Sequence, residues 1–187
     1  IRFKNSHAWF IVGAAGTGKS HLIGDIVTKR QLNDAHSILL LGEKFNSQDE
    51  PLTQIVQLLD YPGRKEQWLR NLNEYGKANQ KPVAIFIDGL NEKGGDVLWS
   101  AHLIGLIDDI ERFEYLRLIV SFRISGARNW FYDMAYNHPE FTVYHHKGFE
   151  GKEDVASEFI FSSFGLDQPL WPAYGSEFAN PLFLIKY

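Results

Sequence analysis

The fold is decided by the stretch Gly13-Ala14-Ala15-Gly16-Thr17-Gly18-Lys19-Ser20. It fits the pattern G-x-x-x-x-G-K-[ST], the Walker A loop. An apolar run precedes it at residues 8–12, and Leu22 and Ile26 follow with helical spacing. A strand before the loop and a helix after it are the context in which this motif holds phosphate groups. An ordinary glycine-rich turn with an exposed lysine is the alternative, which both flanking elements disfavour.

Each residue type in this loop has a chemical task. Glycines let the backbone wrap around phosphates and point successive N–H groups inward. The helix expected to begin near Gly18 adds the positive end of its dipole. Lys19 can reach the β- and γ-phosphates, and the Ser20 hydroxyl can ligate Mg²⁺. We therefore expect residues 13–20 to form a nucleotide site together with the next residue, His21.

Apolar runs and helical patterns alternate along the rest of the chain. Further strands are expected at residues 37–41, 83–87, 116–122 and 141–145. Helices are expected after the loop and at residues 52–59, 65–78, 99–113, 127–136 and 152–164. Strands that are apolar throughout are covered on both faces, and strands separated by helices form parallel sheets. The predicted fold is an α/β three-layer sandwich with a mostly parallel five-stranded sheet.

The alternation ends near residue 165. A glutamine and two prolines interrupt the pattern, and a helical tail is expected from near Ser176. We expect a core domain over residues 1–165, with residues 166–187 as the start of a small helical appendage. The chain begins without methionine and stops within an apolar helical pattern, so we interpret it as a piece of a longer protein.

Composition excludes several classes of protein. Nineteen Lys and Arg against 23 Asp and Glu give a net charge of −4, so the overall charge predicts no nucleic-acid or anionic-membrane surface. The absence of cysteine excludes a disulfide framework and a thiol nucleophile. No apolar run approaches the roughly 20 residues that cross a bilayer. We expect a cytoplasmic protein with no membrane contact and no direct nucleic-acid binding.

An acidic partner for the loop is expected where the strand 83–87 ends. A phosphate loop needs a carboxylate at the end of a neighbouring strand to hold the Mg²⁺ shell, and Asp88 supplies one. Glu92 is the candidate that polarises the attacking water, because Gly89 lets the loop bend back toward the γ-phosphate. The alternatives are a strand-end turn residue for Asp88 and a solvated loop carboxylate for Glu92.

Arg123 ends the strand 116–122 and is therefore expected at the same edge of the sheet. A guanidinium there can sense the γ-phosphate and stabilise charge in the transition state. Two alternatives stay open: Arg123 pairs with a surface carboxylate, or the nearby Arg128 takes this role.

Four strings together resemble the STAND class of P-loop NTPases, which includes NACHT proteins. They are the Walker A loop, Asp88-Gly89-Leu90-Asn91-Glu92, Ser121-Phe122-Arg123 and Asn180-Pro181-Leu182-Phe183-Leu184. The resemblance is strongest to the prokaryotic antiviral STAND NTPases (AVAST type), which carry similar IDxLNE and NPLFL strings, and it covers nearly the whole chain. NACHT domains usually have Asp-Glu where this chain has Asn91-Glu92, so a metal role at position 91 is in doubt.

The resemblance implies a nucleotide switch. ATP or ADP would bind with Mg²⁺, with Ser20 and Asp88 at the metal and Pro181 against the adenine. Lys19, Asp88, Glu92 and Arg123 would carry hydrolysis. Bound ADP would hold a closed monomer. Exchange for ATP, after a protein trigger such as a phage product is sensed through regions absent here, would drive homo-oligomerisation.

Three functions are compatible with these residues. The first is an ATP-hydrolysing switch, and the second is a module that holds nucleotide as structural glue with negligible hydrolysis. The third is a small-molecule phosphoryl transferase, which needs an arginine-rich lid segment that the sequence lacks. The absence of an Asn-Lys-x-Asp string disfavours a GTPase.

Overall fold

The computed structural model describes residues 6–93, 95–124, 141–165, 167 and 179–186, together with 131, 134, 137 and 138. Its elements in chain order are β1 Ala8–Gly13, α1 Lys19–Leu32, β2 Ser37–Leu41, η1 Gly42–Lys44, α2 Pro51–Leu58, α3 Lys65–Ala78, β3 Val83–Asp88, α4 Asp96–Glu111, β4 Leu116–Arg123, β5 Thr142–His145, α6 Glu153–Ser163 and α7 Pro181–Lys186. No helix within these ranges is long and apolar enough to cross a membrane.

The five strands form one sheet in the order β2-β3-β4-β1-β5, and all four strand pairs are parallel. Each strand lies within one residue of its predicted bounds at either end. Strands β1, β3 and β4 are short, mainly apolar and largely buried, as expected for strands between two helical layers, whereas the edge strands β2 and β5 are partly exposed. The predicted α/β fold is confirmed.

The strand order corrects one expectation. The strand that ends in Asp88, β3, is not the immediate neighbour of β1, because β4 lies between them. In the register, Val12 of β1 is opposite Phe122 of β4, and Ile87 of β3 is opposite Val120 of the same strand. The carboxyl end of β4 therefore separates Asp88 from the phosphate loop. Chain order alone does not determine which strands pair.

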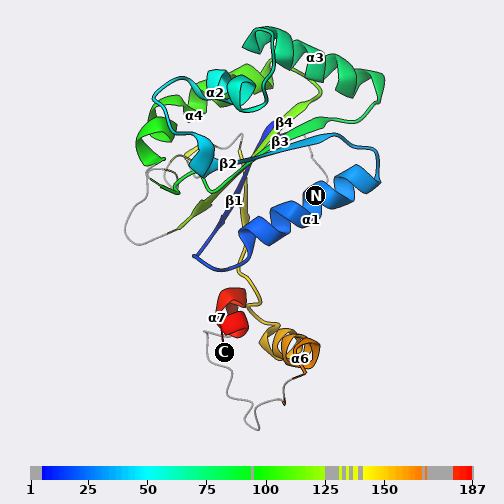
Figure 1. Cartoon of the computed structure of the whole chain (residues 1–187), viewed down its shortest axis with the longest axis vertical. Coiled ribbons are helices and arrows are strands. Elements are labelled where there is room, and N and C mark those ends of the chain that lie inside the picture. The colour runs from blue at the N-terminus through cyan, green and yellow to red at the C-terminus, as the bar shows by residue number, and fades with distance from the viewer. Residues whose placement is uncertain are drawn as a thin grey trace.

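Helices cover both faces of the sheet, with α2, α3 and α4 on one face and α1 on the other (Figure 1). Phe10 and Ile85 join Leu103 of α4 in the larger buried cluster. Ile11, the residue after Phe10, joins Ile23 of α1 in the smaller one. Neighbouring residues enter opposite clusters because side chains alternate across a strand. This arrangement is the predicted three-layer sandwich.

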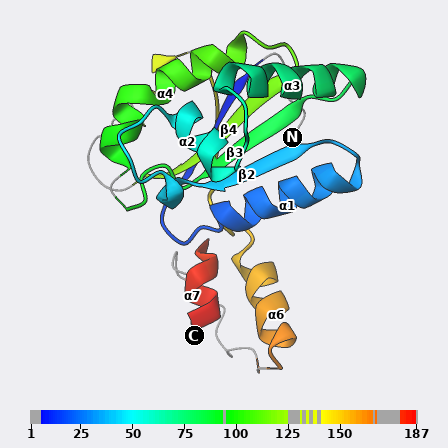
Figure 2. The ribbon, with the colours of Figure 1, turned by 45° about the horizontal axis from the view of Figure 1, so that its top comes forward.

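The remaining predictions concern the second half of the chain. Of the helix predicted at residues 127–136, Phe131 and Met134 are helical and buried, and its other residues lie outside the described ones. Arg128 and the predicted helix start near Ser176 lie outside them too. Helices α6 and α7 lie side by side near the carboxyl edge of the sheet in both views (Figure 2). The division at residue 165 stays a prediction.

Candidate functional site

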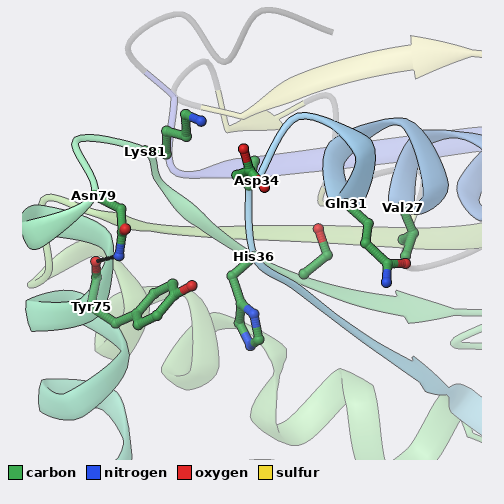
Figure 3. A pocket seen from close by; sticks show the side chains of 9 residues that line it. Val27, Gln31, Asp34, His36, Tyr75, Asn79 and Lys81 are labelled. Atoms are coloured by element: carbon green, nitrogen blue, oxygen red, sulfur yellow. Dashed lines mark hydrogen bonds between the residues drawn. The ribbon is translucent and has the colours of Figure 1, made fainter.

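Two pockets lie at opposite edges of the sheet. One of about 700 Å³ is at the amino edge, between the ends of α1 and α3, where His36 and Tyr75 face it (Figure 3). It contains none of the residues predicted to bind nucleotide. The other, of about 250 Å³, is at the carboxyl edge. Its lining residues are Gly16, Gly18, Lys19, Ser20, His21, Asp88, Gly89, Glu92, Ser121, Arg123, Pro181 and Leu182.

The phosphate loop connects β1 to α1 by a backbone that needs glycine. Gly16 has φ +78° and Gly18 has φ +92°, values that side chains with a Cβ disfavour. Gly18 is the N-cap of α1, so the helix begins at Lys19, as predicted. The Thr17 hydroxyl donates to the Ala14 carbonyl at 3.0 Å, a hydrogen bond within the loop that connects these two residues. The first N–H groups of α1 thus face the carboxyl-edge pocket, where an anion gains most from them.

Lys19 is 7% exposed, and its ammonium lies within the loop that it belongs to. Its Nζ donates to the carbonyls of Gly13 at 3.0 Å and Ala14 at 2.8 Å. Burial lowers the pKa of Lys19, Arg123 lowers it further, and the carboxylates of Asp88 and Glu92 act in the opposite direction. An anion in the pocket would favour the charged ammonium, so this environment favours a bound phosphate.

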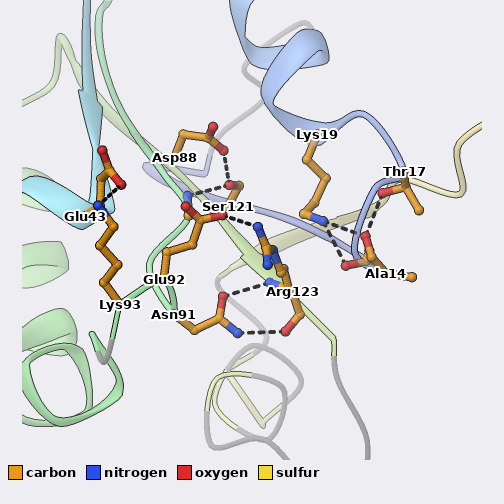
Figure 4. Close-up of polar contacts among 12 residues, drawn as sticks. Ala14, Thr17, Lys19, Glu43, Asp88, Asn91, Glu92, Lys93, Ser121 and Arg123 are labelled. Atoms are coloured by element: carbon orange, nitrogen blue, oxygen red, sulfur yellow. Dashed lines mark hydrogen bonds and ion pairs between the residues drawn. The ribbon is translucent and has the colours of Figure 1, made fainter. Parts of the chain in front are cut away.

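Asp88 is held by Ser121, a fully buried residue of β4. The Ser121 hydroxyl donates to Asp88 Oδ1, and the Gly89 N–H donates to that hydroxyl at 2.9 Å (Figure 4). The backbone of Ser121 also accepts a bond from the Leu90 N–H at 2.8 Å. The intervening strand β4 therefore orients the carboxylate that ends β3.

Glu92 and Arg123 contact each other. Arg123 Nη2 donates to Glu92 Oε1 at 2.6 Å, with both side chains partly exposed (Figure 4). Asn91 fixes this arrangement through both amide atoms: its Nδ2 donates to the Arg123 carbonyl and its Oδ1 accepts from the Arg123 N–H, each at 2.9 Å. The loop after β3 is thereby attached to the end of β4. Pairing with a carboxylate was one of the alternatives open for Arg123.

Mg²⁺ prefers oxygen ligands, and the pocket offers them in Ser20 and Asp88. The bond from Ser121 engages Oδ1 of Asp88, which leaves Oδ2 for a metal-bound water. A hydroxyl and one carboxylate fit the usual protein share of a magnesium shell, in which waters and phosphate oxygens supply the rest.

The structure brings most of the predicted residues together. Lys19, Asp88, Glu92 and Arg123 line one pocket with Ser20 and Pro181. The predicted loop residues outside its lining are Gly13, Ala14, Ala15 and Thr17, which shape the loop from behind.

Sequence reasoning missed three contributors to this site. Ser121 carried a signal, since it is a polar residue within an otherwise apolar strand. Asn91 attracted notice only as a departure from a family pattern. His146 gave no signal: it follows β5, its N–H donates to the Val12 carbonyl at 2.7 Å, and its own carbonyl lies where a Cβ on Gly13 would be. Glycine is therefore required at the start of the loop.

Comparison with known proteins bears on the fold. Neither a family model nor a curated protein matches this chain. Solved structures do match, among them Drosophila ORC bound to DNA, with a TM-score of 0.57, 12% identity, and coverage of 86% of this chain and 42% of that one. The replication initiator DnaA bound to AMPPCP and single-stranded DNA has a TM-score of 0.52, 10% identity, and coverage of 88% and 47%.

The Aeropyrum pernix ORC2 protein (ADPNP-ADP complexes) has a TM-score of 0.51, 14% identity, and coverage of 86% and 46%. The chain thus spans less than half the length of each of these proteins. At such identities the likeness concerns the fold alone. Together with the parallel five-stranded sheet and the Walker A loop at its carboxyl edge, it shows that the chain has the α/β fold of P-loop NTPases.

Proposed function

We propose that this chain is the ATP-binding and ATP-hydrolysing switch domain of a STAND NTPase. One observation carries the proposal: the phosphate loop lines the same 250 Å³ pocket as Asp88, Glu92 and Arg123. An ammonium, a metal-binding carboxylate, a second carboxylate and a guanidinium are the groups that phosphoryl transfer to water requires.

In the proposed mechanism the loop amides and Lys19 hold the phosphates. The Lys19 ammonium exchanges the carbonyls of Gly13 and Ala14 for phosphate oxygens. Ser20 and Asp88 would hold Mg²⁺, which when bound would neutralise charge on the phosphates. Arg123 turns from Glu92 to the γ-phosphate, which frees the Glu92 carboxylate to orient a water and accept its proton.

Adenine is the proposed base. Pro181 lines the pocket where α7 begins and offers an apolar surface to a base. Two of the structural neighbours were solved with analogues of ATP, AMPPCP and ADPNP. The sequence also lacks the Asn-Lys-x-Asp string that reads guanine.

The biological role is proposed from the resemblance of the four strings to STAND NTPases, in which residues 87–92 and 180–184 are similar to strings of the antiviral members. ADP would hold a closed monomer, and exchange for ATP in response to a protein trigger would drive homo-oligomerisation in a cytoplasmic defence response. In this proposal residues 1–165 form the nucleotide-binding core and residues 166–187 begin the helical appendage. Light scattering of the parent protein with ADP and with ATP tests the oligomerisation step, which requires a larger mass with ATP.

One observation favours a second candidate, a module that binds nucleotide with negligible hydrolysis. Glu92 is ion-paired with Arg123 at 2.6 Å, and a carboxylate engaged in that pair is not placed to orient a water. If the pair persists with nucleotide bound, the nucleotide serves only to stabilise the folded chain.

Phosphate release by Glu92→Gln separates the two candidates. If Glu92 acts as the base, its loss should slow steady-state release by about 100-fold or more while ATP affinity is retained. Glu150→Gln is the matched control, because Glu150 is also paired with a cation, Lys147 at 2.9 Å, outside the pocket.

Equal rates for wild type and Glu92→Gln would remove Glu92 from the mechanism. A wild-type protein that binds nucleotide but releases no phosphate would favour the second candidate. A wild-type protein that binds no nucleotide would contradict both.

A further inference from the structure

The start of α7 is bonded to the phosphate loop. Asn180 Nδ2 donates to the Ala15 carbonyl at 3.1 Å, across 165 residues of sequence. The N–H of Leu182, the second residue of α7, lies 3.4 Å from the Gly16 carbonyl. Two successive carbonyls of the loop are thus engaged by the segment in which α7 begins.

The same Asn180 side chain caps α7. Its Oδ1 accepts from the Leu182 N–H at 3.0 Å, which is the bond an N-cap residue makes to the second residue of its helix. Pro181 occupies the first helical position, where a missing N–H costs nothing. One amide group therefore joins a helix terminus to the phosphate loop, with a different atom for each task.

The fit between loop and α7 is close. A Cβ on Gly16 would lie 2.7 Å from Asn180 Oδ1 and 3.0 Å from the Leu182 Cβ. On the other side of the segment, the Ala179 carbonyl accepts from the Phe149 N–H at 2.8 Å, so the start of α7 is also attached to the chain that leaves β5. The loop has little room to change its backbone while Asn180 stays in place.

We propose that Asn180 is the positioning residue that couples the phosphate loop to α7. Its Nδ2 holds the Ala15 carbonyl, and its Oδ1 fixes the Leu182 N–H that lies at the Gly16 carbonyl, so that the loop is oriented for phosphate. The proposal rests on nucleotide binding in the 250 Å³ pocket, which Pro181 and Leu182 also line. A bound nucleotide and the Asn180 bond to the loop then both favour the position in which α7 is attached to the phosphate loop.

Coupling of this kind is reciprocal. If the attached α7 raises the affinity of the loop for nucleotide, bound nucleotide stabilises the attachment of α7 by the same factor. A single hydrogen bond of this type changes an equilibrium about 2- to 10-fold. The nucleotide would thereby control the position of the segment that leads out of the core.

Substitutions at Asn180 separate its two tasks. Asn180→Ser retains a side-chain oxygen for the N-cap but is too short to reach the Ala15 carbonyl, whereas Asn180→Ala loses both bonds. Asn79→Ser is the matched control, because Asn79 Nδ2 also donates to a carbonyl at a helix end, that of Tyr75 at 2.8 Å, beside the amino-edge pocket. Circular dichroism and thermal unfolding verify that each variant is folded.

Two measurements are made on each folded protein. Calorimetry with ADP and with ATP gives the affinity, and hydrogen exchange of the α7 amides is followed with and without ADP. We expect Asn180→Ser and Asn180→Ala to lose about 2- to 10-fold in affinity alike, and to lose the slowing of α7 exchange that ADP causes in the wild type. Asn79→Ser should match the wild type in both.

Wild-type affinity in Asn180→Ser would show that the side chain serves only as a helix cap and would overturn the proposal. An unchanged response of α7 exchange to ADP in that variant would overturn it as well. Failure of the wild type to bind either nucleotide would instead remove the proposed function, and this inference with it.

Discussion

A serine hydroxyl has one proton, and this determines the direction of the bonds around Asp88. Because the Gly89 N–H donates to Ser121 Oγ, the hydroxyl proton is directed to Asp88 Oδ1. One carboxylate oxygen is thus held as an acceptor, and the orientation of the other follows. The orientation of the Asp88 carboxylate therefore depends on Ser121, a buried residue of the neighbouring strand β4.

Ser121→Ala should raise the Mg²⁺ concentration needed for ATP binding, with little change in affinity measured in EDTA, because Asp88 loses its orientation. It should also lower the free energy of unfolding by about 1–3 kcal/mol, since the Gly89 N–H is left without this partner. Magnesium titrations and urea unfolding measure the two effects.

Ser157→Ala is the control for this prediction. Ser157 is equally buried, and its hydroxyl donates to the Asp154 carbonyl at 2.9 Å within α6, outside the pocket. It should lose stability without any change in the Mg²⁺ titration. If Ser121→Ala needs the same Mg²⁺ concentration for ATP binding as the wild type does, Ser121 does not orient Asp88 for a metal.

His146 should make stability depend on pH. Burial lowers the pKa of His146, a hydrogen bond with the Thr17 backbone acts in the opposite direction, and the Lys19 charge lowers it again. With the folded-state pKa below the unfolded value near 6.5, the unfolded chain takes up the proton first as pH falls. Stability should therefore decrease from about pH 7.5 to pH 5.5, as urea midpoints can show.

His146→Gln should reduce this dependence of stability on pH. His145→Gln, at the exposed neighbouring position, serves as the control. Some slope should persist, because burial and the Arg117 charge also lower the pKa of His7. A slope that is the same in wild type and His146→Gln would contradict the assignment.

Among the elements, α4 shows how packing supports the site. Its buried side chains lie on the sheet face that carries Phe10 and Ile85, and the helix begins directly after the loop that follows β3, with Gly95 as its N-cap. Displacement of α4 would move that loop, which contains Glu92. The stability of α4 is thus a condition for the geometry of the pocket.

Leu103→Ala should lower the free energy of unfolding by about 2–5 kcal/mol, because Leu103 is fully buried and truncation leaves a cavity. Its neighbour Ile104, 36% exposed, provides the control within the same helix. In the same urea titration, Ile104→Ala should lower the free energy of unfolding clearly less than Leu103→Ala does. Equal losses would mean that α4 does not present this face to the sheet.

At the scale of the whole molecule, a nucleotide that binds only the folded state stabilises it by mass action. At 100 times Kd the gain is about 2.7 kcal/mol, which for a chain of this size raises Tm by roughly 5–11 °C. We expect this shift with ADP and with MgATP. Differential scanning calorimetry measures it directly.

At the same nucleotide concentration, Lys19→Ala should remove about half to nearly all of this shift in Tm, because loss of a charge-assisted contact costs about 1.5–3 kcal/mol, or roughly 10- to 150-fold in affinity. Lys29→Ala, at an exposed position in the last turn of α1, is the control and should shift as the wild type does. An undiminished shift in Lys19→Ala would place the nucleotide elsewhere.

Much of the fold could be read from local pattern. Short, mainly apolar runs predicted the strands that the structure describes, most clearly the buried central strands β1, β3 and β4. The glycines of residues 13–20 indicated the conformation of this loop, since glycine is favoured where φ is positive, as at Gly16 and Gly18. Asp88 and Arg123 were assigned to one edge because all parallel strands end on the same side.

Tertiary structure decided which of these parts meet. The position of β4 between β1 and β3, the bond from Ser121 to Asp88 and the pairing of Glu92 with Arg123 depend on strand order. The contact of Asn180 with Ala15 joins residues 165 apart in the chain. Periodicity and turn chemistry are local in the sequence, so they determine elements and edges. Contacts between distant residues arise only when whole elements pack, and no local pattern encodes them.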